Sequence, residues 1–197
     1  MNAKLSRAVL TAIALTLGTF FEQPAQIVFA QTDADHWTDL IDGQSLEGWT
    51  QRGGKANYEV QDGAIVGSSV PNTPNSFLCT EKDYGDFELQ LEFKVDPQLN
   101  SGIQIRSQSL DHYKNGQVHG YQVEIDPSDR AWTAGIYDEG RRGWLADLTN
   151  NRDARYAFKQ NEWNHVRILA VGDRIQTWLN DVPCADLTDS KTAFTTS

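Results

Sequence analysis

The sequence is short of cysteine and of positive charge, and each shortage excludes a class of protein. The 197 residues include two cysteines, Cys79 and Cys184, too few for a disulfide framework, although an oxidising compartment would allow the two to pair. The 17 lysines and arginines stand against 27 aspartates and glutamates, so the formal net charge is −10. We expect no nucleic-acid or anionic-lipid partner for such an acidic surface, which suits a neutral carbohydrate as well as plain solubility.

Long apolar runs are also scarce. The one clear example, Ala8–Phe21 (AVLTAIALTLGTFF), follows a basic segment, Met1–Arg7, and precedes Val28–Ala30, whose residues suit a signal peptidase. These features are typical of a cleaved secretory signal peptide, predicted here for residues 1–30, and the apolar run is too short to span a bilayer comfortably. An uncleaved N-terminal anchor is the alternative. We therefore expect an exported protein, periplasmic or extracellular, whose mature part from about Gln31 has no membrane span.

Helical periodicity of useful length is missing after the predicted signal, and short alternating runs take its place. Asp86–Val95 alternates strictly between apolar and polar residues, as a strand with one face in a core does. Ser101–Gln108 and Gly120–Asp126 repeat the pattern, and Asp62-Gly63 marks a hairpin turn inside Ala56–Ser68. Several short strands joined by Gly, Asp and Asn turns predict an all-β fold, an antiparallel β-sandwich or jelly roll.

The rest of the chain predicts more strands and one long loop. Asn164–Leu187 predicts a hairpin around Gly172-Asp173, with a further strand after the turn at Asn180-Asp181. Leu145–Trp163 is long and polar and could hold one helical turn. Because no internal repeat is found, we interpret residues 31–197 as a single β-sandwich domain.

The polar faces of three predicted strands are rich in carboxylates and amides. They carry Glu88, Gln90 and Glu92, then Gln104 and Arg106, and then Gln122, Glu124 and Asp126. Ring side chains stand on other segments: Trp132, Tyr137, Trp144 and Trp178. If the three strands are neighbours, these groups form one polar and aromatic surface of the kind that binds sugars. The alternative is the solvated outer face of an ordinary antiparallel sheet.

Glu124 and Asp126 are the leading candidates for catalysis. Residues two apart on a strand share a face at about 6.6 Å, so their carboxyl groups suit the two-carboxylate site of a glycosidase. The spacing is similar to the E-x-D-x-x-E strand of jelly-roll β-glucanases, with Asp129 as third acid. Pro127 favours a turn after Asp126, which would leave Asp129 outside the site and give Asp126 an alternative role as an Asx-turn acceptor. Glu124 is therefore the stronger candidate.

Three further residues are candidates for the site. Arg106 could pair with Glu124 across neighbouring strands, or stabilise an oxyanion or enolate. His119 stands at the start of its strand, where a plain surface or core role is the alternative. Arg142 lies in a Gly-rich charged segment, Gly135–Leu145, which is the kind of loop that carries binding residues, although an ion-paired hairpin fits equally.

The candidate site combines three catalytic residues with seven binding residues. For catalysis it comprises Glu124, Asp126 and Arg106, and for substrate binding Gln104, Gln122, His119, Tyr137, Arg142, Trp144 and Trp178. No metal-ligand spacing of the H-x-x-H or C-x-x-C kind occurs. We expect no cofactor and no catalytic metal, although the acidic residues could hold a structural Ca²⁺ ion.

Several segments, in order along the chain, resemble one known family. Trp37–Trp49 (WTDLIDGQSLEGW) is similar to the LFdGksLdGW opening of the 3-keto-disaccharide hydrolase family. The later motifs YGDFELQLEFKV, NSGIQIRS, HGYQVEIDPSDRAWTAGIYDEGRRGW and EWNHVRI…DRIQTWLNDVPCAD also match, so the resemblance covers Trp37–Asp189. It implies a concanavalin-like lectin/glucanase jelly roll in an exported bacterial protein.

The resemblance also implies a reaction. The substrates would be 3-keto-glycosides, sugars that a partner dehydrogenase has oxidised at C3. The C3 carbonyl acidifies the hydrogen at C2, so a carboxylate base can remove it, the C1 substituent leaves by elimination, and water then adds. The resemblance implies this base role for Glu124. Many relatives have the order E-V-Q where this chain has Gln122-Val123-Glu124, which moves the carboxylate by one strand step.

Two other functions stay open, and the C-terminus carries one further expectation. A non-catalytic carbohydrate-binding module and a retaining β-glucanase-like glycosidase fit the same scaffold. Members of the family usually continue with a GFIGLQ-like strand and a final R-x-x-NI-x-I strand. We therefore expect the domain over residues 31–197 to lack its C-terminal strands, which would expose strand edges.

Overall fold

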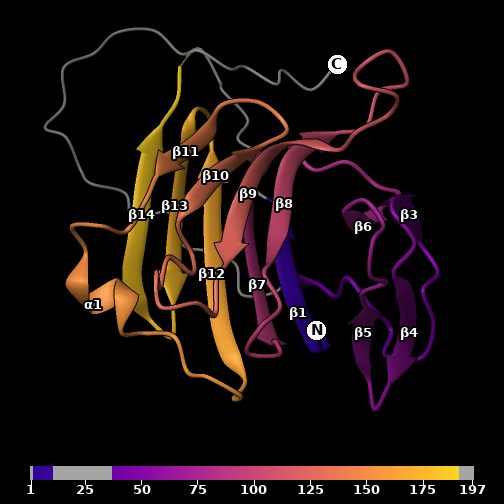
Figure 1. The fold of residues 1–197 in the computed structure, drawn as a ribbon, viewed down its shortest axis with the longest axis horizontal. Coiled ribbons are helices and arrows are strands. Elements are labelled where there is room, and N and C mark those ends of the chain that lie inside the picture. The colour runs from indigo at the N-terminus through magenta and orange to yellow at the C-terminus, as the bar shows by residue number, and fades with distance from the viewer. Residues whose placement is uncertain (1, 11–36, 191–197) are drawn as a thin grey trace, which may run out of the picture.

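The computed structural model describes residues 2–10 and 37–190, which form mostly antiparallel strands (Figure 1). The larger sheet has the strand order β14–β13–β12–β7–β1–β5–β4, and β2 pairs with β1. Its strands are β1 (Asn2–Leu10), β2 (Trp37–Thr38), β4 (Asn57–Gln61), β5 (Ala64–Ser68), β7 (Phe87–Lys94), β12 (Asn164–Val171), β13 (Arg174–Leu179) and β14 (Val182–Thr188).

A four-stranded sheet and a separate strand pair complete the fold. The four-stranded sheet has the order β11–β10–β9–β8, so β8 lies at its edge. Its strands are β8 (Ser101–Gln108), β9 (His119–Ile125), β10 (Ile136–Glu139) and β11 (Gly143–Ala146), and the pair consists of β3 (Trp49–Gly53) and β6 (Ser76–Thr80). The helix α1 (Arg152–Arg155) is a single turn. Within the described ranges, no helix has the length and apolar character that crossing a bilayer requires.

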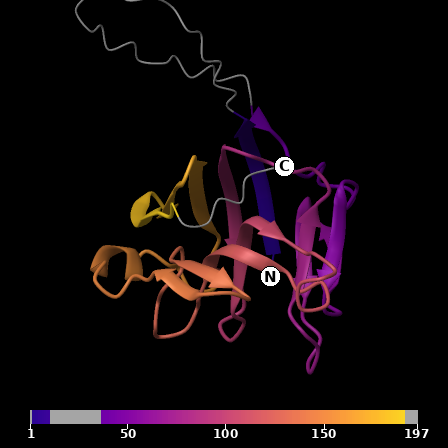
Figure 2. The ribbon, with the colours of Figure 1, turned by 90° about the horizontal axis from the view of Figure 1, so that it is seen from above.

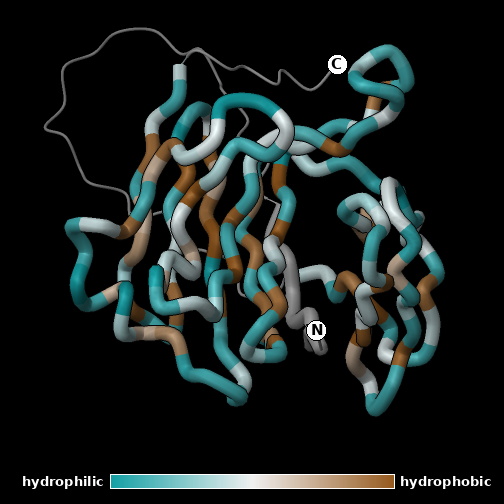
Figure 3. Tube along the Cα trace, viewed as in Figure 1, coloured by the Kyte–Doolittle hydropathy of each residue, from teal (hydrophilic) through white to brown (hydrophobic). Residues whose placement is uncertain are grey.

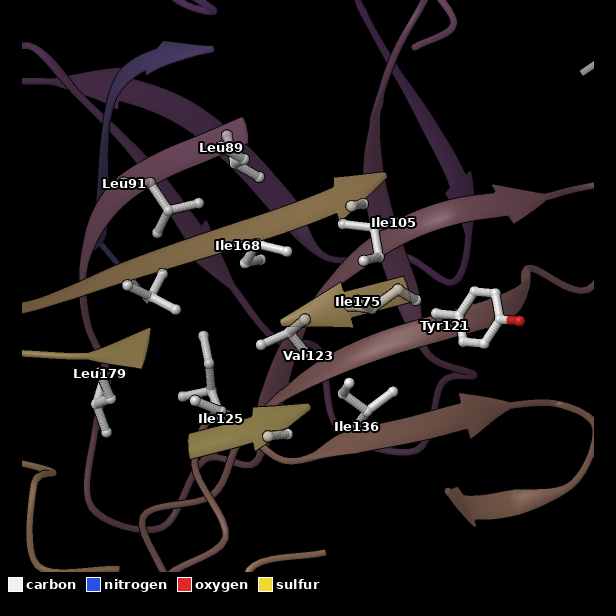
Figure 4. Packing of buried hydrophobic residues seen from close by; sticks show 14 of the residues in the cluster. Leu89, Leu91, Ile105, Tyr121, Val123, Ile125, Ile136, Ile168, Ile175 and Leu179 are labelled. Atoms are coloured by element: carbon white, nitrogen blue, oxygen red, sulfur yellow. The ribbon is translucent and has the colours of Figure 1, made fainter. Parts of the chain in front are cut away.

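The four-stranded sheet packs across the larger sheet, as the view from above shows (Figure 2). Hydrophobic and hydrophilic residues alternate along the strands (Figure 3), so each sheet turns one apolar face inward. Val123 and Ile125 of β9 meet Ile168 and Ile175 of the larger sheet in the core (Figure 4). This burial is the main stabilising term of the fold. The protein is an all-β, antiparallel sandwich of the jelly-roll type, as predicted.

The predicted elements are present with nearly the predicted bounds. The Asp62-Gly63 turn joins β4 to β5, and the segment after residue 163 forms β12, β13 and β14. The single helical turn expected in Leu145–Trp163 is α1, which begins at Arg152 after its N-cap Asn151. Local turn chemistry and period-two alternation were sufficient for these assignments.

The three polar strands are not all neighbours, and for β7 the alternative of a solvated outer face is the one that the structure shows. β7 does not join the sheet of β8 and β9 but pairs with β12, with Phe93 opposite Asn164. The apolar faces of β7 and β9 both point into the core, so their polar faces point away from each other. Glu88, Gln90 and Glu92 therefore lie on the outer face of the larger sheet, remote from Glu124.

The N-terminal segment and the two cysteines bear on the predicted export of the chain. Most of the predicted signal peptide, residues 11–30, lies outside the described residues, and Asn2–Leu10 at its start forms β1 between β7 and β5. Cleavage of this segment and export of the chain stay predictions. Cys79 and Cys184 are both free thiols, and burial raises the pKa of Cys184 to about 12, so this cysteine stays protonated.

Candidate functional site

Strand β9 is buried on both of its faces, and Glu124 lies on the face opposite the core. Its side chain is 5% exposed. One carboxylate oxygen, Oε1, accepts a hydrogen bond from Nδ2 of Asn100 at 2.7 Å, and Oε2 accepts one from Nε2 of Gln122 at 2.8 Å. A buried carboxyl group with two amide donors is held in a fixed orientation.

A chain of hydrogen bonds leads from the edge strand to this carboxylate. The hydroxyl group of Ser107 donates to Oε1 of Gln104 at 2.5 Å, and Nε2 of Gln104 donates to Oε1 of Gln122 at 2.7 Å. Gln122 then donates to Glu124. Gln104 and Gln122 lie directly opposite each other on the neighbouring strands β8 and β9. Each amide has a second N–H group.

Asp126 closes the turn after β9 and connects to the same site through Arg130. Ser128 donates to Oδ1 of Asp126 from its backbone N–H at 3.2 Å and from its hydroxyl group at 2.6 Å, so the predicted Asx turn is present. Nε of Arg130 lies 2.7 Å from Oδ2 of Asp126, and its Nη2 lies 3.8 Å from Oε1 of Glu124. Burial on its own would raise the pKa of Asp126, but the hydrogen bonds from Ser128 and Arg130 lower it below the usual carboxyl value.

Aromatic rings stand beside this charged group. Tyr137 of β10 lies opposite Gln122 in the sheet, and its ring meets Trp144 of β11 edge-on at 5.3 Å. Trp144 also meets Trp132 edge-on at 4.7 Å, and the guanidinium group of Arg130 lies about 5 Å from both indole rings. Rings next to amides and carboxylates are the usual components of a sugar-binding surface.

A cleft of about 1500 Å³ runs along the edge strand β8 and faces the strand pair β3–β6. Its wall on the side of the four-stranded sheet includes Gln104, Gln122 and Glu139. Burial raises the pKa of Glu139, the negative charge of Glu124 raises it further, and a hydrogen bond with Asn75 partly opposes both. The cleft thus joins polar side chains, a carboxyl group of raised pKa and an opening large enough for a disaccharide-sized ligand.

Arg106 does not pair with Glu124, so the first of the two roles considered for it is wrong. Its guanidinium group binds Oδ1 of Asp86 at 2.8 Å and the carbonyl oxygen of Gly172. The reason lies in the backbone, because Arg106 has a φ of +46° and the register of β8 with β9 shifts between Ile105 and Gln108. A bulge of this kind redirects the side chains that follow it.

Three predicted binding residues lie outside the group around Glu124. His119 is buried, its Nδ1 donates to the carbonyl oxygen of Gln117 at 2.8 Å, and its ring packs on the ring of Tyr113. Arg142 is held by Asp138 and Asp189 in an ion-pair network. Trp178 lies under the guanidinium group of Arg167 on the outer face of the larger sheet.

Sequence reasoning did not select Asn100, Arg130 or Glu139 for the site. Arg130 follows Asp126 by four residues, and this spacing across a tight turn was a usable signal. Asn100 lies in the loop before β8, and its contact with Glu124 spans 24 residues, so no local pattern indicates it. In the described part of the chain, no cluster of three or more His, Cys, Asp or Glu side chains could hold a metal ion. The expectations on Ca²⁺ and cofactors stay predictions.

The site combines amides that line a cleft with a buried carboxylate and indole rings on the same sheet, which are the components of a carbohydrate-binding site. The model of the 3-keto-alpha-glucoside-1,2-lyase-like domain matches residues 36–197, so the chain belongs to this family. Membership supports a hydrolase-type, glycoside-directed function. No curated protein is similar enough to this chain to count as a relative.

Two solved structures from Parabacteroides distasonis are similar to this chain, and each is described as a "putative glycosyl hydrolase". The first has a TM-score of 0.55 and 20% identity, and the match covers 78% of this chain and 72% of that one. The second has a TM-score of 0.42 and 21% identity, with coverage of 73% and 61%. The first of these similarities supports the sandwich fold.

Proposed function

We propose that this protein cleaves 3-keto-glycosides by removing the proton at C2 and eliminating the substituent at C1. The observation that carries the proposal is the hydrogen-bond chain that ends on Glu124 beside the cleft. A ketone at C3 makes the C2 hydrogen acidic, so a carboxylate can take it as a proton if the enolate oxygen is stabilised. The second N–H groups of Gln104 and Gln122 are suitable donors for that oxygen.

Family membership and the state of Asp126 support this reaction over ordinary glycoside displacement. A retaining glycosidase needs one carboxyl group that is protonated at working pH beside a second that is ionised. The pKa of Asp126 is lowered, and the group is held by Ser128 and Arg130, so Asp126 is unsuited to donate a proton. Elimination followed by addition of water gives net hydrolysis without that pair.

The proposed substrate has to be supplied by a second enzyme. This substrate carries a ketone at C3, so an enzyme that oxidises sugars at this position must supply it. The predicted signal peptide would place both steps outside the cytoplasm. A non-catalytic carbohydrate-binding module is the second candidate, since Trp132 and Trp144 form a ring pair that could bind a sugar without chemistry.

The substrate test separates these functions. The purified protein is incubated with a 3-keto-glucoside and, separately, with the parent glucoside, and sugar and aglycone are followed by chromatography and mass spectrometry. We expect consumption of the oxidised sugar alone, with release of the aglycone. Binding of the oxidised sugar without turnover would favour the binding module, and cleavage of the parent glucoside would favour an ordinary glycosidase.

A substitution at Gly102 tests the series of hydrogen bonds that ends on Glu124. Gly102 lies opposite Glu124, and a Cβ atom there would stand 2.5 Å from Cγ and Cδ of Gln122. Gly102→Ala should therefore displace Gln122 from Glu124 and lower kcat/KM for the oxidised sugar by up to about 100-fold. Gly85→Ala is the matched control, since a Cβ there meets no atom within 4 Å. Equal activity of the two variants would contradict a catalytic role for the hydrogen bond between Gln122 and Glu124.

A further inference from the structure

Glu139 stands on the same face of the four-stranded sheet as the hydrogen-bond chain. It is the last residue of β10 and lies opposite Gly120, while Tyr137, two residues earlier, lies opposite Gln122. Residues two apart on a strand share a face, so Glu139, Tyr137 and Gln122 all point away from the core. Glu139 also lines the cleft, together with Gln104 and Gln122.

Gly120 brings the start of the hydrogen-bond chain next to Glu139. A Cβ atom on Gly120 would lie 2.5 Å from Oγ of Ser107, so the hydroxyl group of Ser107 takes the space that a larger residue would fill. This hydroxyl group donates to Gln104, the first amide of the chain. A carboxyl group, a hydroxyl group and two amides therefore converge at one end of the cleft.

Glu124 is less suited to touch a substrate than Glu139 is. Only 5% of Glu124 is exposed, and each of its oxygens accepts an amide N–H, from Asn100 and from Gln122. Glu139 is half-buried and lies at the wall of the cleft. A base must come within hydrogen-bond reach of the proton that it removes, and of these two carboxylates Glu139 has the access.

We infer that Glu139 is the base that removes the C2 proton and that Glu124 is a positioning residue. The inference rests on the proposed function. The carboxylate of Glu139 takes the proton, and the C2–H electron pair forms an enolate with the C3 carbonyl. The enolate electrons then form the C1=C2 double bond, the C3 carbonyl is restored, and the aglycone oxygen leaves with the C1–O pair and takes a proton from water. The proton on Glu139 passes to solvent.

The charges around Glu139 match this role. Burial and the charge of Glu124 raise its pKa, and the hydrogen bond with Asn75 lowers it. A base whose pKa is closer to the working pH combines ionisation with a strong tendency to accept the proton. Other charged or titratable groups border this end of the cleft. They include Tyr137 on the same strand, Tyr113 and Lys114 at the carbonyl oxygen of Gly140, Arg52, His119, and Arg106 with its partner Asp86.

The test compares carboxylate variants on the 3-keto-glucoside. Glu139→Gln should lower kcat/KM by about 10²–10⁴-fold, and it should suppress deuterium incorporation at C2 from D₂O. Glu139→Ala should regain activity when formate is added, because a small carboxylate can enter the space left at the cleft wall. Glu92→Gln on the outer face of the larger sheet is the control and should match the wild type.

The pH profile distinguishes a base from a structural residue. Activity of the wild type should fall as the pH drops through the raised pKa of Glu139, because the protonated form cannot accept the C2 proton. A folded Glu139→Gln variant with the wild-type rate and the same acidic limb would overturn the inference alone. A wild type that leaves the oxidised sugar unchanged would overturn the proposed function and this inference with it.

Discussion

Replacing Asp138 with alanine should lower the free energy of unfolding by about 3–5 kcal/mol. Its carboxylate is fully buried and binds Nε of Arg141 at 2.6 Å and Nε of Arg142. Arg142 also binds Asp189 at 2.6 Å, and the hydroxyl group of Tyr121 donates to the same Asp189 oxygen. The network ties the end of β14 to β9 and β10, and its loss would leave two guanidinium groups without their shared counter-charge.

Urea unfolding followed by tryptophan fluorescence measures this effect. The control is Asp186→Ala, which breaks an Asp–Arg pair with Arg174 in which both side chains are about half exposed. Exposed pairs contribute little because water screens them and holding the side chains together costs entropy. We expect the midpoint of Asp186→Ala to stay close to the wild type. Equal, small shifts for both variants would show that the network around Asp138 is not a stabilising feature.

The sequence was sufficient for the strands but not for their neighbours. Alternation has a period of two, so it fixes which side chains of Phe87–Lys94 share a face. It does not say which strand lies alongside, and β7 pairs with β12, some 70 residues further on, rather than with β8. The alternation of β7 was therefore read correctly, but only the topology shows that its polar face is the solvated outer face of the larger sheet.

The site could be predicted where side-chain direction follows the strand and not where the backbone departs from it. Gln104, Gln122 and Glu124 lie together because β8 and β9 are regular at these positions. Arg106 sits at a positive φ beside a register shift, and the residues from Ile105 to Gln108 include no glycine or proline that would indicate a bulge. Trp144 and Trp178 could not be distinguished by residue type. Only the strand order shows that Trp144 lies beside the site and that Trp178 lies on the outer face of the larger sheet.

Glu124→Gln should reduce kcat/KM for the 3-keto-glucoside by about 100-fold, because both oxygens of Glu124 accept hydrogen bonds. Glutamine has one oxygen and one NH₂ group, so it would set a donor against either Asn100 or Gln122. The hydrogen-bonded amides would then no longer be anchored at residue 124, and Gln104 and Gln122 would lose the orientation in which they can donate to the enolate oxygen. We expect the loss mainly in kcat, measured with purified protein at saturating substrate.

The same substitution should also move the pH profile. The negative charge of Glu124 is one of the causes that raise the pKa of Glu139, so its removal lowers that pKa. A base with a lower pKa stays ionised to lower pH, and the acidic limb of the Glu124→Gln profile should shift in that direction. A shift to higher pH would contradict the coupling between the two carboxyl groups.

Glu88→Gln provides the matched control for this loss of charge. Glu88 also accepts an amide N–H, from Gln90 at 2.9 Å, and it binds Nε of Arg167 at 2.6 Å, which holds its pKa below the usual value. It has the same kind of partners as Glu124 but lies on the outer face of the larger sheet. Unchanged kinetics in Glu88→Gln would assign the loss in Glu124→Gln to the site, because a general effect of removing a carboxylate would lower both.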